Sequence, residues 1–162
     1  MKVVSNSSPL INLSRIGRID LLCSMYGTLL VPNAVWNEVV IEGQGLPGAE
    51  TIKSCSWVVK KEIKNFPLVH TLRQDLDAGE AEAITLALEV KADFLLMDER
   101  LGRDTAQHLG IRCLGLVGVL IEAKNRGLID KVKPIIVALR DLAGFRISQN
   151  LFERVISDTD EI

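Results

Sequence analysis

Short apolar runs alternate with segments of helical periodicity along this chain, and no other feature of the sequence constrains its fold as strongly. Val3-Val4 and Phe94-Leu95-Leu96-Met97 are brief and apolar throughout, which is typical of strands buried on both faces. Strands that alternate with helices in this way form a parallel sheet joined by right-handed crossovers. The sequence therefore predicts an α/β fold, a three-layer α/β/α sandwich with a central parallel sheet.

The chain of 162 residues is long enough for one domain with a substantial core. We expect a single domain over residues 1–157 and an acidic tail over 158–162 that frays. The predicted strands span residues 2–5, 28–31, 57–63, 93–97 and 111–114. The predicted helices span residues 8–16, 21–26, 33–43, 49–54, 79–90, 100–109, 116–126, 130–143 and 149–156, with a short one from about residue 68. The Gly-rich stretch 43–48 is predicted to be a mobile loop.

The composition narrows the possible functions. A net charge of −2 argues against a protein that coats nucleic acid, because such a protein needs a basic surface. A local basic rim around an acidic site is still possible, from Lys60, Lys61, Lys64, Arg73, Arg100, Arg103, Lys124, Arg126, Lys131 and Lys133. The sequence has no apolar run long enough to span a membrane and no signal-peptide layout, so we expect a cytoplasmic protein. Its three separated cysteines fit buried small side chains better than a disulfide or zinc scaffold.

Four separated polar residues are candidates for one site. Asn6 and Asp98 each directly follow a predicted strand, and ligands of open parallel sheets bind beyond the carboxyl ends of such strands. Glu38 and Glu80 lie on predicted helices. Each residue also has an ordinary structural interpretation. Asn6 and Asp98 could be turn or N-cap residues, Glu38 could face solvent, and an acid such as Glu80 is favoured in a first helical turn.

Oxygen atoms dominate this set of side chains, and this determines the chemistry that we expect. Three carboxylates and one amide at one edge of a sheet would suit Mg²⁺ or Mn²⁺, which take oxygen ligands. Such a cation can activate water for attack on a phosphodiester and stabilise the departing oxygen. No serine-based nucleophilic constellation competes with this interpretation. His70 and His108 lie away from the strand ends and are expected to be structural or surface residues.

Short motifs around these positions resemble those of PIN-domain proteins, many of which are Mg²⁺- or Mn²⁺-dependent ribonucleases and toxins of toxin–antitoxin pairs. The similarity covers about residues 2–126 and is strongest to a PIN-like subgroup that begins with a strand followed by Ser-Asp/Asn-Thr/Ser-Ser-Pro-Leu-Ile. This chain has Ser5-Asn6-Ser7-Ser8-Pro9-Leu10-Ile11 at that place. Gly79–Ile84, Leu96–Arg100 and Gly144–Ser148 also resemble the subgroup.

The resemblance implies a set of site residues. It places the four acidic positions of the family on Asn6, Glu38, Glu80 and Asp98, which would bind the metal, and it assigns catalysis to the three acids among them. It places a supporting polar residue on Ser8. The further acids that could reach the site are Glu82, Glu99 and Asp104. Asn6 offers an oxygen but removes one negative charge, and Glu80 is one methylene longer than the Asp of the wider family.

Three functions remain open from the sequence. The first is a metal-dependent ribonuclease, the toxin-like component of a toxin–antitoxin pair, with single-stranded RNA as substrate and a small antitoxin protein as partner. The second is a PIN-like nucleic-acid- or protein-binding module with a weakened or inactive metal site, and the amide at Asn6 separates these two. The third is a Rossmann-like domain with a small-molecule function, which would need a phosphate-cradling Gly-rich motif that the sequence lacks.

The apolar content of several predicted helices also predicts a homodimer. A sheet covered on both faces by so short a chain could leave an apolar patch exposed, and two-fold dimers are the commonest closed assembly. The residues concerned are Ile19, Leu21, Leu22, Met25, Leu116, Val119, Leu120, Leu128, Ile129, Ile135 and Ile136.

Overall fold

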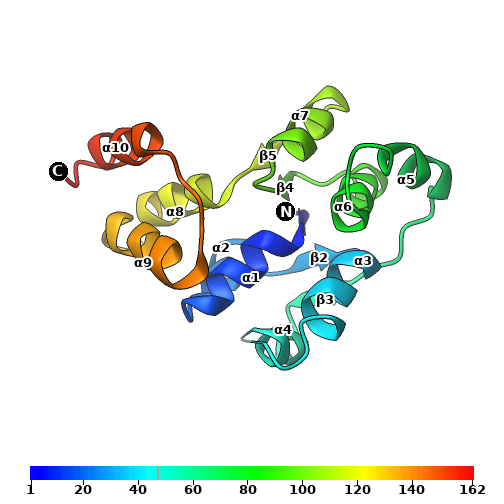
Figure 1. Ribbon diagram of the computed structural model, residues 1–162, viewed down its shortest axis with the longest axis horizontal. Helices are drawn as coiled ribbons and strands as arrows, with labels where there is room; N and C mark the ends of the chain where they lie inside the picture. The colour runs from blue at the N-terminus through cyan, green and yellow to red at the C-terminus, as the bar shows by residue number, and fades with distance from the viewer. Residues whose placement is uncertain (47) are drawn as a thin grey trace.

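The computed structural model describes residues 1–46 and 48–162, so Pro47, inside the predicted loop 43–48, lies outside the described residues. A parallel sheet runs through the centre of the molecule (Figure 1). Its strands are β1 (Val3–Ser5), β2 (Leu29–Val31), β3 (Val58–Lys60), β4 (Phe94–Leu96) and β5 (Cys113–Leu114). They lie in the order β3-β2-β1-β4-β5, and every neighbouring pair is parallel.

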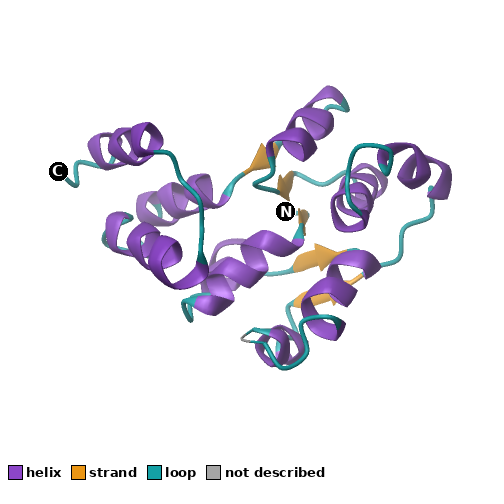
Figure 2. Ribbon diagram, viewed as in Figure 1, coloured by secondary structure: helices purple, strands orange, loops and turns teal. Residues whose placement is uncertain are grey.

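Helices surround the sheet (Figure 2). They are α1 (Ser7–Arg15), α2 (Asp20–Tyr26), α3 (Asn33–Trp36), the π-helix η1 (Asn37–Ile41), α4 (Ala49–Ser54), α5 (Phe66–Leu72), α6 (Ala78–Val90), α7 (Arg100–His108), α8 (Leu116–Asn125), α9 (Lys133–Ala143) and α10 (Gln149–Asp158). The larger core contains residues of α1, α2, α8 and α9, whereas the smaller core contains residues of α6 and α7 with α5 packed against it. The predicted three-layer α/β/α fold is confirmed.

The central strand β1 shows why its first two residues are both apolar. Val3 belongs to the larger core and Val4 to the smaller one, and both are fully buried. Successive side chains of a strand point to opposite faces, so a strand covered on both sides buries apolar residues on both of them. The buried hydroxyl of Ser5, at the end of the strand, is satisfied by donating to the carbonyl of Asn6 at 2.8 Å.

Some element boundaries differ from the prediction, each for a local reason. The third strand ends at Lys60 rather than at residue 63, before the charged pair Lys61-Glu62. Helix α5 begins at Phe66, earlier than predicted, because the side chain of Asn65 accepts a hydrogen bond from Leu68 N at 3.1 Å.

The predicted helix 33–43 is divided between α3 and the π-helix η1. Within it the amide of Glu42 donates to the carbonyl of Asn37, five residues earlier, at 2.7 Å. π-Turns often occur at functional sites, and this one carries Glu38.

The expectation that the acidic tail frays is wrong. The carboxylate of Glu161 accepts hydrogen bonds from the amides of Val132 and Lys133 at 2.8 and 2.9 Å, at the start of α9, and it pairs with Lys124 Nζ at 2.9 Å. Burial alone would raise the pKa of Glu161, but these donors lower it to about 2. The tail is therefore held against the ends of α8 and α9.

The apolar residues from which a dimer was predicted are not an exposed patch. Ten of the eleven are buried in the core, and only Leu128, at 40% exposure, reaches the surface. The structure thus removes the reason for that prediction without testing the oligomeric state. The cysteines, expected to be buried, are free and half-buried.

Candidate functional site

The carboxyl edge of the sheet has a topological switch point between β1 and β4. The chain leaves β1 toward β2 and β3 and then returns to add β4 on the other side of β1. Asn6 directly follows β1, its amide donates to the carbonyl of Leu96 at 2.9 Å, and Asp98 lies two residues beyond Leu96. Both side chains therefore start from the place where open parallel sheets bind their ligands.

Asn6 occupies the N-cap position of α1, but its side chain does not cap the helix. Its Nδ2 donates to Glu99 Oε2 at 3.1 Å, and its Oδ1 is buried and accepts no hydrogen bond from any described residue. A buried acceptor without a partner costs about 1–3 kcal/mol, so its retention requires an explanation.

Two carboxylates face the same spot as this unpaired oxygen. A Cβ built on Gly79 would lie 3.3 Å from Asn6 Oδ1, 3.2 Å from Glu38 Oε2 and 3.5 Å from Asp77 Oδ1. The absence of a side chain at Gly79 keeps the space between these oxygens open. Ser7 Oγ holds Glu38 by donating to its Oε2 at 2.8 Å.

Glu80 combines a structural contact with one free oxygen. Its Oε1 accepts from the amide of Asp77 at 3.0 Å, and its own amide donates to Asp77 Oδ1 at 2.8 Å, which forms a capping box at the start of α6. Its Oε2 lies 3.2 Å from the position of a Cβ on Gly102 of α7. Burial raises the pKa of Glu80 to about 7, and the charges of Asp77 and Glu99 contribute to the increase.

Asp98 is not the N-cap of α7, since that position belongs to Glu99. Asp98 Oδ1 instead accepts from the amide of Leu116, the first residue of α8, at 2.8 Å, and its Oδ2 accepts from Ser8 Oγ at 3.4 Å. The neighbouring hydroxyls of Ser7 and Ser8 thus hold Glu38 and Asp98 from the first turn of α1.

Glu99 connects the acidic residues. Burial raises the pKa values of Glu38, Glu80 and Asp98, and the negative charge of Glu99 raises each of them further. Glu99 also accepts the hydrogen bond from Asn6. The sequence ranked Glu99 only as a supporting acid and missed Ser7 and Asp77. The spacing Asp77-x-x-Glu80 was an available signal for the capping box.

Two of the candidate acids have other contacts. Glu82 Oε1 accepts from the amide of Ala34 at 3.1 Å and so stabilises the start of α3. Asp104 is exposed on α7, where it borders a surface hollow with Gln107 and His108. Among the described residues, no hydrogen bond or ion pair joins either acid to the cluster at Asn6. His70 and His108 are exposed, as expected of surface residues.

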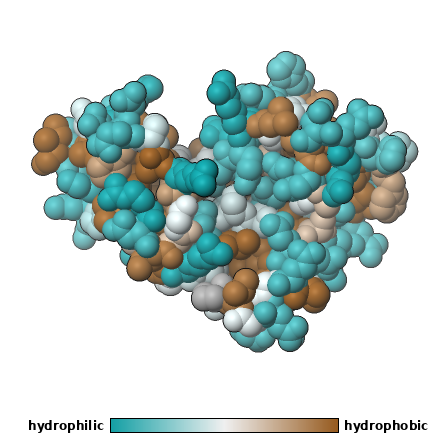
Figure 3. Space-filling view, viewed as in Figure 1, coloured by the Kyte–Doolittle hydropathy of each residue, from teal (hydrophilic) through white to brown (hydrophobic). Residues whose placement is uncertain are grey.

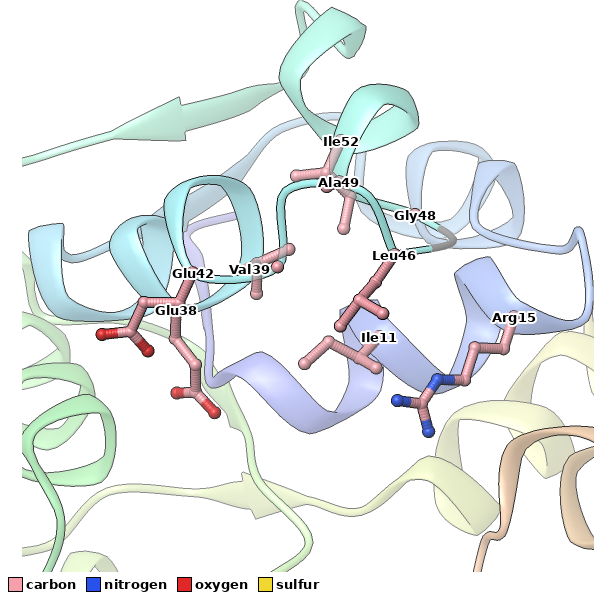
Figure 4. A pocket seen from close by; sticks show the side chains of 10 residues that line it. Ile11, Arg15, Glu38, Val39, Glu42, Leu46, Gly48, Ala49 and Ile52 are labelled. Carbon is pink, nitrogen blue, oxygen red and sulfur yellow. The ribbon is translucent and has the colours of Figure 1, made fainter.

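Glu38 and Asp98 each border a cavity. Glu38 borders a pocket of about 120 Å³ between α1 and η1, in which Ile11 and Leu46 face each other (Figure 4). Arg15 lies at the opposite end of this pocket from Glu38 (Figure 4). Asp98 borders a larger cavity, of about 340 Å³, beside α7 and α8.

The side chains at this edge offer oxygen atoms, the type of ligand that a hard divalent cation prefers. Among residues 1–46 and 48–162, no three His, Cys, Asp or Glu side chains form a ready group for a metal ion. Mg²⁺, however, keeps several waters and needs only one or two protein carboxylates. The unpaired Oδ1 of Asn6 and the adjacent Oε2 of Glu38 meet that requirement.

These features define a class of protein, the parallel α/β domains that carry an acidic cluster at the switch point of the sheet. A family model for the PIN domain matches residues 2–161, and the chain therefore belongs to the PIN-domain family.

A solved structure of a PilT N-terminus domain protein from the hyperthermophilic archaeon Sulfolobus solfataricus has the same fold. It matches with a TM-score of 0.58 and 18% sequence identity, over 76% of this chain and 93% of the archaeal chain. No curated protein matches the chain. Outside Pro47, the structure contains no helix with the length and apolar character needed to cross a membrane.

Proposed function

We propose that this PIN-domain chain is a metal-dependent ribonuclease that hydrolyses the phosphodiester bonds of RNA. The observation that supports this most strongly is the buried Oδ1 of Asn6, which has no partner among the described residues and lies beside Glu38 Oε2 at the switch point. A cation between these oxygens would satisfy the unpaired acceptor and offset the repulsion among the neighbouring carboxylates.

In this proposal Asn6, Glu38, Glu80 and Asp98 hold Mg²⁺ or Mn²⁺, and Glu99 adds negative charge. A bound cation of this kind supplies an activated water and stabilises the oxygen that leaves the phosphate. Ser7 and Ser8 keep Glu38 and Asp98 in position. Before a cation binds, burial raises the pKa of Glu80 to about 7, and a cation held beside its carboxylate would favour the charged form that ligation needs.

The test is cleavage of a 5′-labelled single-stranded RNA by protein stripped of metal and then supplied with Mg²⁺ or Mn²⁺. We expect cleavage only with metal, and a loss of about 100-fold or more in Asp98→Asn. Asp141→Asn, which makes the same change on the exposed surface of α9, is the control. Equal cleavage by the two variants, or cleavage unaffected by a chelator, would contradict the proposal.

The biological role that we propose is the toxin-like half of a toxin–antitoxin pair, acting in the cytoplasm as a homodimer and restrained by a small antitoxin protein. Family membership supports this role. Induced expression in a bacterium should slow growth, and Asp98→Asn should not. Light scattering that finds only monomer at high micromolar concentration would contradict the dimer and leave the nuclease proposal intact.

A second function is favoured by the contact between Asn6 and Glu99. The amide stands where the family has a carboxylate, so the cluster has one charge fewer, and it occupies Glu99 with a hydrogen bond. A binding module with an inactive metal site would have such a contact. RNA binding without cleavage in Mn²⁺, with cleavage appearing in Asn6→Asp, would identify this second function.

A further inference from the structure

The cavity beside Asp98 has two arginines on its walls. It measures about 340 Å³ and is bordered by Arg103 of α7, by Gly115 at the start of α8, and by Phe145, Arg146 and Ile147. Figure 3 shows this face of the molecule hollowed between α7 and α10. The cavity therefore opens directly from the acidic edge of the sheet toward the surface.

Arg103 approaches Asp98 without pairing with it. A Cβ on Gly115 would lie 3.0 Å from Arg103 Nη1 and 3.1 Å from Asp98 Oδ1, so glycine is what allows the guanidinium so close to the carboxylate. No side-chain hydrogen bond or ion pair of Arg103 is formed with any described residue, whereas Asp98 accepts from Leu116 N and Ser8 Oγ. The charge of Arg103 nevertheless lowers the pKa of Asp98 against the effect of burial.

Arg146 reaches the cavity from the extended segment that joins α9 to α10 (Figure 1). Gly144 ends α9 with a φ of +72°, a conformation that glycine adopts without strain. Phe145 and Ile147 pack against the larger core, whereas Arg146 between them is exposed. It too has no hydrogen bond or ion pair within the described part of the chain.

Two unpaired guanidinium groups at one cavity, next to an acid that is already hydrogen-bonded, are suited to a phosphate. Guanidinium binds phosphate oxygens through parallel hydrogen bonds and is more weakly hydrated than an ammonium group. The chain as a whole has a net charge of −2, so attraction of a polyanion must come from such local groups.

We propose that this Arg103–Arg146 cavity holds a phosphodiester of the RNA strand next to the bond that is cleaved at the acidic site. The proposal rests on the ribonuclease function above and adds the residues that position the strand. Arg146 is absent from the basic residues that the sequence offered as a rim, although the segment Gly144–Ser148 resembled the PIN-like subgroup.

The test is binding of a fluorescein-labelled single-stranded RNA to metal-free protein in a chelator, measured by anisotropy over a range of NaCl concentrations. Arg146→Gln and Arg103→Gln should each weaken binding about 5–10-fold. Each should also reduce the slope of log Kd against log salt by about 0.7, the value for one lost phosphate contact on a single strand. Arg146→Lys should retain part of both.

Arg112→Gln is the matched control, because Arg112 is exposed and lies just before β5, at the opposite edge of the sheet. Equal binding by Arg146→Gln and Arg112→Gln would overturn the proposal, as would a wild-type chain that binds no RNA in the chelator. Displacement of the RNA by low concentrations of inorganic phosphate would also overturn it, because it would identify a small-anion site. Wild-type RNA binding that depends on both arginines, without cleavage in Mn²⁺, would refute the nuclease function and leave the cavity assignment standing.

Discussion

Replacing Asn6 with Asp should make the stability of the protein depend more strongly on a divalent cation. In the metal-free protein the change removes the donor that Asn6 Nδ2 offers to Glu99 Oε2 at 3.1 Å. It also adds a carboxylate to a cluster in which burial and mutual repulsion already raise the pKa values of Glu38 and Asp98. Losing a hydrogen bond to a charged group costs about 2 kcal/mol. For a domain of this size that corresponds to a fall in Tm of about 4–8 °C.

A bound cation should offset most of this loss. The new carboxylate, at the position that Asn6 Oδ1 occupies in wild type, strengthens the attraction for Mn²⁺. Tenfold tighter binding adds about 1.4 kcal/mol to the free energy of unfolding at saturating metal. Addition of Mn²⁺ should therefore raise the Tm of Asn6→Asp by about 3–5 °C more than it raises the Tm of wild type.

The assay is thermal unfolding of both proteins in a chelator and in Mn²⁺, with metal affinity measured by calorimetry. Asn150→Asp, which makes the same change at an exposed position of α10, should behave like wild type in both buffers. The reasoning would be refuted if Asn6→Asp were as stable as wild type in the chelator, or if Mn²⁺ stabilised the two proteins equally.

Three other predictions follow from single contacts. Gly79→Ala should weaken Mn²⁺ binding about tenfold, because the new Cβ fills the space beside Asn6 Oδ1. It should not lower Tm, because alanine stabilises a helix by about 1 kcal/mol relative to glycine. Calorimetry tests the affinity and thermal unfolding tests the Tm, and a lower Tm with unchanged affinity would contradict this prediction. The free energy of unfolding of the metal-free protein should fall by about 1–2 kcal/mol between about pH 5 and pH 8. In the folded state the pKa of Glu80 is about 7, above its ordinary 4.5, and the extra proton that the folded state binds is released through that window. Glu80→Gln should flatten this loss in denaturant titrations, and stability that rises over the window would refute it. Glu161→Gln should lower the free energy of unfolding by about 1–2 kcal/mol at neutral pH. The difference from wild type should shrink as the pH falls from the ordinary pKa of a glutamate toward the folded-state pKa of Glu161, about 2. A difference that is constant with pH would count against the contacts of Glu161 with the start of α9.

The layers of the fold could be predicted because their causes are local. The apolar runs Val3-Val4 and Phe94–Leu96, with helical periodicity between them, are sufficient to indicate a parallel sheet with two covered faces. The start of α5 and the contacts of the C-terminal tail could not be predicted in the same way. Asn65 caps α5 through a single side chain, and Glu161 is held by amides about 30 residues earlier in the chain.

The candidate site was predictable only in part, for a similar reason. The strand-end positions of Asn6 and Asp98 follow from the order of elements, and the structure places them at one edge. The partner of each acid depends on contacts across the fold. Glu82 differs from Glu80 by two positions on one helix, yet it turns to Ala34 while Glu80 closes a capping box on Asp77.

In the segment after α9, apolar and basic residues alternate, and the role proposed for the arginine among them depends on where the fold places the segment. Phe145, Arg146 and Ile147 read apolar, basic, apolar, and an extended chain sends alternate residues to opposite sides. The turn at Gly144, closed by the amide of Phe145 donating to the carbonyl of Leu139 at 3.0 Å, ends α9, and the segment after it borders the same cavity as Val117 and Gly118 of α8. The two apolar side chains can then pack on the core, which leaves the arginine facing the cavity beside Asp98. The same three residues after a longer loop would keep their alternation and lose the cavity.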